Sequence, residues 1–138
     1  MIDMNSLLSV PFGKAVETAL PFGRAIDTAK ALLKEEGFGV LCDIDVAATM
    51  KEKIDVEFRP YRILGACNPH FALQSLTAQP QLGLLLPCNV VVQELDGKTV
   101  VSAVDANVML SITGADLHDL ATEVNTRLFR VLEKMAAN

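Results

Sequence analysis

The spacing of apolar residues predicts two long helices. After Pro21, which suits the first turn of a helix, apolar residues recur with helical spacing as far as Leu33. Gly37 then supplies the left-handed residue that often follows a helix end. A second apolar stripe runs over residues 117–135. We expect this last helix to begin at residues 113–116, whose pattern resembles a capping box.

Between these helices, apolar segments have the spacing or the length of strands. Residues 40–46 alternate, which places Cys42 on an apolar face and Asp43 and Asp45 on the other. Residues 82–95 are apolar without alternation, as in a strand buried on both faces. Pro87 predicts a bulge or a sheet edge within that strand. The expected strands cover residues 40–46, 61–67, 82–95 and 98–104, with a further short strand at 108–112.

Cap and turn residues separate these strands. Asn68 is a good N-cap and Pro69 a good first helical residue, so a short helix through Leu76 is expected. Residues 47–54 also suit a short helix. The pair Asp96 and Gly97 is a strong hairpin signal. The resulting order of elements is typical of an α+β fold, with helices packed on a mostly antiparallel sheet.

One near-repeat precedes the strands: PFGKAVETAL at residues 11–20 is followed by PFGRAIDTAK at 21–30. Its period is too short for a solenoid. The second copy opens the first long helix, and the two copies can adopt different structures.

The length and composition predict one folded domain. The chain has 138 residues, of which 51% are hydrophobic and 21% charged. A chain of this size buries enough surface to fold without a metal or a disulfide. We assign residues 1–11 to an N-terminal extension and residues 12–138 to a single α+β domain.

The net charge, the aromatic content and the lack of a long apolar stretch argue against nucleic-acid and membrane partners. Lys and Arg number 12 against 17 Asp and Glu, which gives a net charge of −5. There is no Trp and only one Tyr. A nucleic-acid binder needs clustered cations or stacking aromatic side chains, so no nucleic-acid partner is expected. No apolar stretch has the length of a membrane span, and the N-terminus lacks the basic start of a signal peptide. We therefore expect no membrane partner.

The three cysteines are Cys42, Cys67 and Cys88. An odd number without a CxxC pair does not fit a secreted disulfide framework. Reduced thiols in the cytoplasm are the simpler interpretation. Because Cys42 alternates with Val40 and Ile44, we expect its side chain in the core.

Four strings of the chain resemble the domain of unknown function 302 family. They are EEGFGVL (35–41), RPYRILGACNP (59–69), GLLLPCNVVV (83–92) and TVVSAVD (99–105). The motifs GACNP and LLLPCNVVV are distinctive together, and the resemblance covers residues 12–135. It implies a fold of the β-α-β(4)-α type, related in outline to the TATA-binding-protein-like architecture, and a homodimer. The resemblance implies no activity, because the family has none firmly assigned. The nucleic-acid function of the namesake architecture does not carry over, because a fold alone does not imply a function.

Two motif segments each place a thiol beside an Asn and a Pro at a break in regular structure. A thiolate can act as a nucleophile, a soft-metal ligand or a redox centre. A buried thiol can equally act as a small hydrophobic side chain. We predict that Cys67 and Cys88 lie closer to each other than to Cys42, and that at least one is accessible from a pocket. The candidate ligand-binding residues are Cys67, Asn68, Cys88, Asn89 and Arg62.

No catalytic residue, metal site or cofactor can be assigned. Two cysteines and His70 do not supply the four ligands of a structural zinc site. His70 and His118 fit exposed positions at helix starts. Arg59 and Arg62 suit either a small anion or ion pairs.

Three functions remain open at this point. The first hypothesis is a dimeric binding module for a small molecule or soft metal near Cys67 and Cys88. The first alternative is a thiol-dependent enzyme or redox protein that uses one of these cysteines, although an enzyme is not favoured. The second is a structural or interaction protein without thiol chemistry. The apolar runs at 82–95 and in the final helix are the expected dimer interface.

Overall fold

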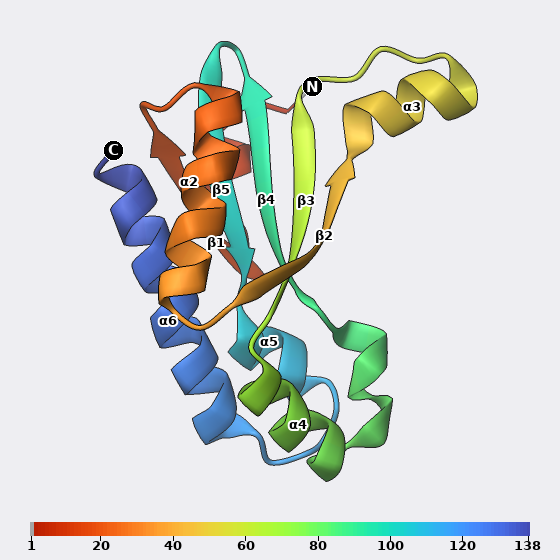
Figure 1. Ribbon diagram of the computed structural model, residues 1–138, viewed down its shortest axis with the longest axis vertical. Coiled ribbons are helices and arrows are strands. Elements are labelled where there is room, and N and C mark those ends of the chain that lie inside the picture. The colour runs from red at the N-terminus through yellow and green to blue at the C-terminus, as the bar shows by residue number, and fades with distance from the viewer. Residues whose placement is uncertain (1) are drawn as a thin grey trace.

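The computed structural model of the protein describes residues 2–138. Its core is a five-stranded sheet in the order β1-β5-β4-β3-β2, in which every neighbouring pair is antiparallel (Figure 1). The elements are α1 (Met4–Leu8), β1 (Gly13–Thr18), α2 (Phe22–Glu35), β2 (Gly39–Asp45), α3 (Val46–Ile54), β3 (Tyr61–Cys67), α4 (Pro69–Ala78), the 3₁₀ helix η1 (Pro80–Leu85), β4 (Cys88–Leu95), β5 (Lys98–Val104), α5 (Ala106–Ser111) and α6 (His118–Ala136).

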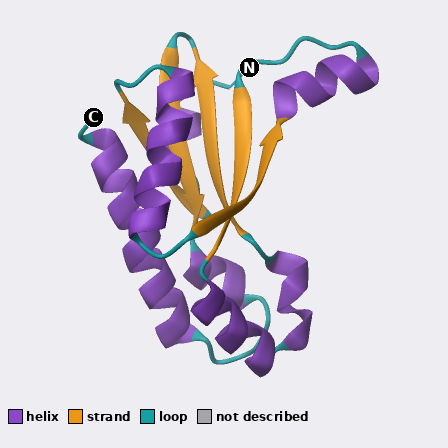
Figure 2. Ribbon diagram, viewed as in Figure 1, coloured by secondary structure: helices purple, strands orange, loops and turns teal. Residues whose placement is uncertain are grey.

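The two long helices lie on one face of the sheet, where they form the second layer of the fold (Figure 2). Helix α2 contacts β2 and β4, and α6 contacts β1 and β5. Their apolar stripes pack against fully buried residues of the central strands, among them Leu64, Val92 and Val101. This arrangement confirms the predicted α+β class and its mostly antiparallel sheet, with short helices added to the β-α-β(4)-α order.

The two copies of the PFG near-repeat adopt different structures. The first becomes the edge strand β1, and the second opens α2. Helix α2 ends as predicted, with Gly37 at a φ of 85°. The Phe38 amide donates to the Leu33 carbonyl at 2.9 Å, and the Phe38 side chain is buried. This is the Schellman arrangement, in which a glycine and the apolar residue after it close the helix.

Local signals also placed the hairpin and the helix after β3 correctly. Asp96 and Gly97 both have positive φ values, 53° and 75°, between β4 and β5. Such angles match the twist of a two-residue hairpin. The Asn68 Oδ1 accepts from the backbone amides of His70 and Phe71 at 3.0 and 3.3 Å, so Asn68 caps α4 as predicted.

Two strand predictions were wrong. Residues 106–111 form helix α5, because Asp105 caps it and the buried Asn125 side chain accepts from the Ala106 amide at 2.7 Å. Residues 80–85 form η1, and β4 begins only at Cys88, after the cis Leu86–Pro87 peptide. Pro87 cannot donate to a sheet ladder, so the strand starts after it instead of bulging around it.

The last helix begins later than predicted. Its N-cap is Leu117, and residues 113–117 are irregular. The Thr113 hydroxyl donates to the Leu110 carbonyl at 2.7 Å and accepts from the Ala115 amide at 3.1 Å. Thr113 therefore closes α5, and the expected capping box with Asp116 does not start α6.

The core position predicted for Cys42 was wrong, because its side chain is exposed. The register between β2 and β3 shifts between Val40 and Cys42. Val40 pairs with Ala66 on the helix-covered face, whereas Cys42 pairs with Gly65 on the opposite face. An extra residue in one strand thus breaks the simple alternation that the sequence suggested.

Most apolar side chains of the two segments expected at a dimer interface pack within the fold. Strand β4 lies between β3 and β5, so both of its edges are already paired. The apolar stripe of α6 is buried against the sheet, as the side chains of Val124, Leu128 and Val131 show. Within the predicted 82–95 run, Leu84 is the apolar residue that remains largely exposed, with 81% of its surface accessible.

Candidate functional site

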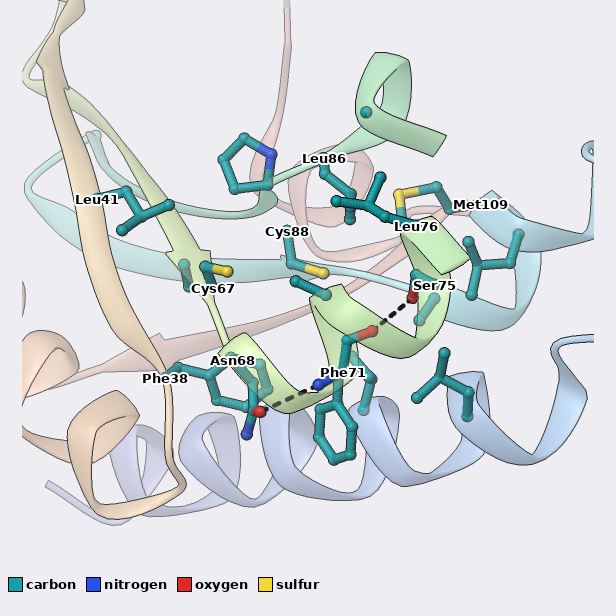
Figure 3. A pocket seen from close by; sticks show the side chains of 18 residues that line it. Phe38, Leu41, Cys67, Asn68, Phe71, Ser75, Leu76, Leu86, Cys88 and Met109 are labelled. Atoms are coloured by element: carbon teal, nitrogen blue, oxygen red, sulfur yellow. Dashed lines mark hydrogen bonds between the residues drawn. The ribbon is translucent and has the colours of Figure 1, made fainter. Parts of the chain in front are cut away.

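The two motif cysteines meet at one end of the sheet. Cys67 is the last residue of β3 and Cys88 the first residue of β4, and these strands are antiparallel neighbours. Their side chains line one cavity of about 270 Å³. Figure 3 shows both sulfur atoms directed toward this space, which we call the thiol cavity. Cys42 does not line it.

Short helices and the long α6 form the rest of the cavity wall. Helix α4 contributes Phe71, Ser75 and Leu76, α5 contributes Met109, and α6 contributes Val124. The complete lining is Phe38, Leu41, Ala66, Cys67, Asn68, Phe71, Ala72, Ser75, Leu76, Gly83, Leu86, Pro87, Cys88, Ala106, Met109, Leu110, Leu120 and Val124. No acidic or basic side chain of residues 2–138 belongs to this set.

The polar groups at the cavity are engaged in holding α4 in place. The Asn68 Oδ1 is used by the helix cap, and the Ser75 hydroxyl donates to the Phe71 carbonyl at 2.8 Å (Figure 3). The guanidinium of Arg127, from α6, lies 5.1 Å from the centre of the Phe71 ring and donates to the Glu36 carbonyl at 3.0 Å. These contacts anchor α4 to α6 and to the end of α2.

The two thiols differ in their surroundings. Cys88 is buried, and its burial raises the pKa of the thiol to about 11, with a smaller contribution from nearby Cys67. Cys88 therefore stays protonated at neutral pH and is a poor nucleophile. Cys67 is half-buried, so one motif thiol is accessible from the cavity, as predicted.

Other candidate residues lie outside the thiol cavity. Asn89 is exposed and lines a separate hollow on the opposite face of the sheet. Arg62 forms a two-contact ion pair with Asp43, with Nε–Oδ1 and Nη2–Oδ2 distances of 2.7 and 2.6 Å, and Lys30 joins them at 2.7 Å. Of the five candidates, the structure brings together Cys67, Asn68 and Cys88.

The sequence did not reveal the residues that close the cavity. Met109 and Leu110 lie in a segment predicted as a strand. The sequence around them therefore did not indicate that they belong to a helix in the cavity wall. Phe71 and Ser75 are four residues apart on α4, a spacing that places two side chains on one face of a helix. For these two residues, the spacing indicated from the sequence that their side chains could line the same cavity.

The positions of the titratable side chains limit the chemistry available. His70 and His118 are exposed, and neither lines the thiol cavity. In residues 2–138, no group of three or more His, Cys, Asp and Glu side chains is placed to hold a metal ion. None of the helices in the described residues is long and apolar enough to cross a bilayer.

Comparison with known proteins identified one family and similar solved structures. The family model described as "Domain of unknown function DUF302" matches residues 14–135. The crystal structure of an uncharacterized conserved DUF302 protein from Bacillus stearothermophilus superimposes with a TM-score of 0.86 at 28% sequence identity. The match covers 91% of this chain and 99% of that chain. None of the curated proteins compared with the chain matches it.

Proposed function

This chain belongs to the DUF302 family, and we propose that it binds a small uncharged molecule in the thiol cavity. The observation that carries this proposal is the apolar cavity at which the segments containing Cys67 and Cys88 converge. Its volume of about 270 Å³ is just below the range of drug-sized ligand pockets, roughly 300–1,000 Å³, so it suits a small molecule. Because charged side chains are missing from its wall, a ligand that buried a charge there would pay a large desolvation cost.

A small molecule is a better candidate than a soft metal. Two thiols alone do not complete the coordination shell of a tetrahedral metal. The thiols also differ, because the high pKa of Cys88 opposes the deprotonation that metal binding requires.

A thiol-dependent enzyme is less well supported. A nucleophilic cysteine needs a base within hydrogen-bonding reach and a group that orients the base. The cavity wall contains neither a histidine nor a carboxylate.

The free thiols of Cys42, Cys67 and Cys88 support a reducing, cytoplasmic environment.

A homodimer through β2 and α3 forms part of this proposal. None of the nine residues of α3 is buried, and the helix projects away from the sheet (Figure 1). Ile44, Ile54, Val56 and Phe58 expose between 38% and 62% of their surface along this edge. A run of exposed apolar side chains beside an unpaired strand edge is typical of a protein interface.

The binding proposal is tested by blocking the cavity. Gly83 lines the thiol cavity, and a Cβ built there would meet no heavy atom within 4 Å. We expect Gly83→Phe to fold and to fill the cavity mouth. Gly23→Phe is the matched control, because Gly23 has the same free space on α2, away from the cavity.

The measurement is a titration with hexanol followed by backbone amide NMR shifts. We expect saturable shifts near Cys67 and Ser75 in the parent protein and in Gly23→Phe, and their loss in Gly83→Phe. Native mass spectrometry of gently purified protein then reports any molecule or metal that it retains. Shifts that are absent from the parent protein, or that persist in Gly83→Phe, would contradict the proposal.

A further inference from the structure

A second cavity of about 300 Å³ lies behind the first, on the opposite face of the sheet. It is lined by Val10 and Phe12 before β1, by side chains of β4 and β5, and by Leu85 and Met109. We call it the strand cavity. Its wall also lacks acidic and basic side chains among the described residues, and most of it is apolar.

The two cavities share a partition formed by one short segment. Along residues 85–89, Leu86 and Cys88 line the thiol cavity, whereas Leu85 and Asn89 line the strand cavity. Pro87 lines both. After Leu85, which ends η1, this alternation is expected for extended backbone, whose successive side chains point to opposite sides.

Met109 is the other residue that lines both cavities. Its side chain is half-buried and belongs to the short helix α5. Methionine is unbranched and flexible, so it can change rotamer at little cost and adapt to a neighbour of a different shape. Pro87 and Met109 are therefore the two residues at which the cavities adjoin, and one of them has a flexible side chain.

The strand cavity adds polar groups that the thiol cavity lacks. Asn89 is exposed and Ser102 is half-buried, and both line it from adjacent strands. An amide and a hydroxyl can hydrogen-bond an uncharged polar group such as an alcohol, without the charge that would favour a carboxylate or phosphate. Asn89 and Ser102 are thus the polar side chains that the strand cavity offers to a ligand.

From these observations we infer that the ligand is an uncharged, straight-chain amphiphile that spans both cavities. Its alkyl chain lies in the thiol cavity and passes between Pro87 and Met109. Its polar end lies at Asn89 and Ser102. The two cavities together fall well inside the usual volume range of ligand pockets, whereas the thiol cavity alone is just below it. This inference rests on the proposed function of the thiol cavity.

A series of straight-chain alcohols from butanol to dodecanol tests the inference. Each methylene group that leaves water should raise affinity about fourfold. If the chain spans both cavities, this increase continues past the length that fills the thiol cavity. We expect Met109→Ala to bind the longest alcohols more tightly. Carboxylates of the same lengths should bind more weakly than the alcohols.

The variant Asn89→Trp tests the contribution of the strand cavity separately from that of the thiol cavity. Because Asn89 is exposed, a Trp there should leave the fold intact and fill the strand cavity. We expect it to weaken binding of the long alcohols at least tenfold and to leave the short ones unchanged. Asn5→Trp, at an exposed position outside both cavities, is the control.

The possible outcomes are distinct. If affinity stops rising at short chains and Asn89→Trp has no effect while Gly83→Phe removes binding, the two-cavity inference is overturned and the thiol cavity remains a binding site. If no alcohol binds the parent protein, both the inference and the proposed function fail. If only long alcohols lose affinity in Asn89→Trp, both are supported.

Discussion

Cys42 and Gly65 are direct partners on β2 and β3, and the Cys42 sulfur occupies the space that a side chain at residue 65 would need. A Cβ at Gly65 would lie 2.5 Å from the Cys42 Sγ and 2.8 Å from the Pro87 Cγ. The glycine of the GACNP motif is thus required by close packing. It also lets Pro87, part of the wall of the thiol cavity, lie against β3.

Replacing this glycine should destabilise the fold. We expect Gly65→Ala to lower the free energy of unfolding by about 1–3 kcal/mol, the usual cost of overpacking. Cys42→Ala in the same chain should recover part of that loss, because it removes one of the two close atoms. Urea denaturation measures both effects. Gly23→Ala, where a Cβ has free space, should be as stable as the parent or more so. A Gly65→Ala protein of unchanged stability would contradict this packing argument.

The ion pair between Asp43 and Arg62 should make stability depend on acid pH. Hydrogen bonds from Arg62, with a smaller contribution from Lys30, lower the pKa of Asp43 from 3.8 to about 2. As the pH falls below about 4, the unfolded chain takes up this proton before the folded protein does, so stability falls toward pH 2. Above pH 4 the contribution is complete.

In Asp43→Asn, the free energy of unfolding should therefore fall less steeply than in the parent protein as the pH drops from about 4 toward 2. At neutral pH we expect it to cost about 1 kcal/mol, because the site is half-buried and partly screened by solvent. Denaturation at a series of pH values measures the change. Asp116→Asn, at an exposed residue, serves as the control. An identical pH dependence in Asp43→Asn and the parent protein would exclude this role of Asp43.

The buried thiol should react most slowly. With its pKa raised to about 11 from an ordinary 9.0, Cys88 has about a hundredfold less thiolate near pH 8 than an unperturbed cysteine. We expect iodoacetamide to modify Cys88 last in the native protein, and all three cysteines at similar rates after unfolding. Mass spectrometry of peptides after timed alkylation gives the order. Early modification of Cys88 would show that it is neither buried nor protonated.

The exposed edge at β2 and α3 should hold two copies together. Light scattering at micromolar concentration is expected to give the mass of a dimer. Ile54→Asp should shift the protein to a monomer, because it places a charge in the proposed apolar contact. Ile112→Asp is the matched control, since Ile112 is equally apolar and even more exposed but lies on the opposite end of the fold. A monomer mass for the parent protein would rule out the proposed interface.

Nucleic acids should not bind specifically. With a net charge of −5 and no Trp, the chain lacks both the clustered cations and the stacking surfaces that such binding uses. Gel-shift measurements with duplex DNA, single-stranded DNA and RNA should show no complex at submicromolar protein. A complex that weakens as salt increases would contradict this expectation.

Several features of the fold were determined by short stretches of sequence. The hairpin at Asp96 and Gly97, the cap at Asn68 and the end of α2 at Gly37 depend on backbone angles and hydrogen bonds within a few residues. Such signals act over a short range, so they can be recognised without knowing what packs nearby. The resemblance to the family added the overall order of strands and helices.

Tertiary structure alone decided which face each residue of β2 presents and what surrounds the two motif thiols. Cys42 alternates with apolar neighbours, yet the register shift beside it turns its side chain away from the core. Residues 106–111 are apolar enough for a strand, but Asp105 and the distant Asn125 stabilise a helix there. The thiol cavity likewise depends on side chains from segments far apart in the chain, from Phe38 to Val124. Apart from the local cap at Asp105, these outcomes follow from contacts between residues far apart in the chain, which the spacing of apolar residues does not reveal.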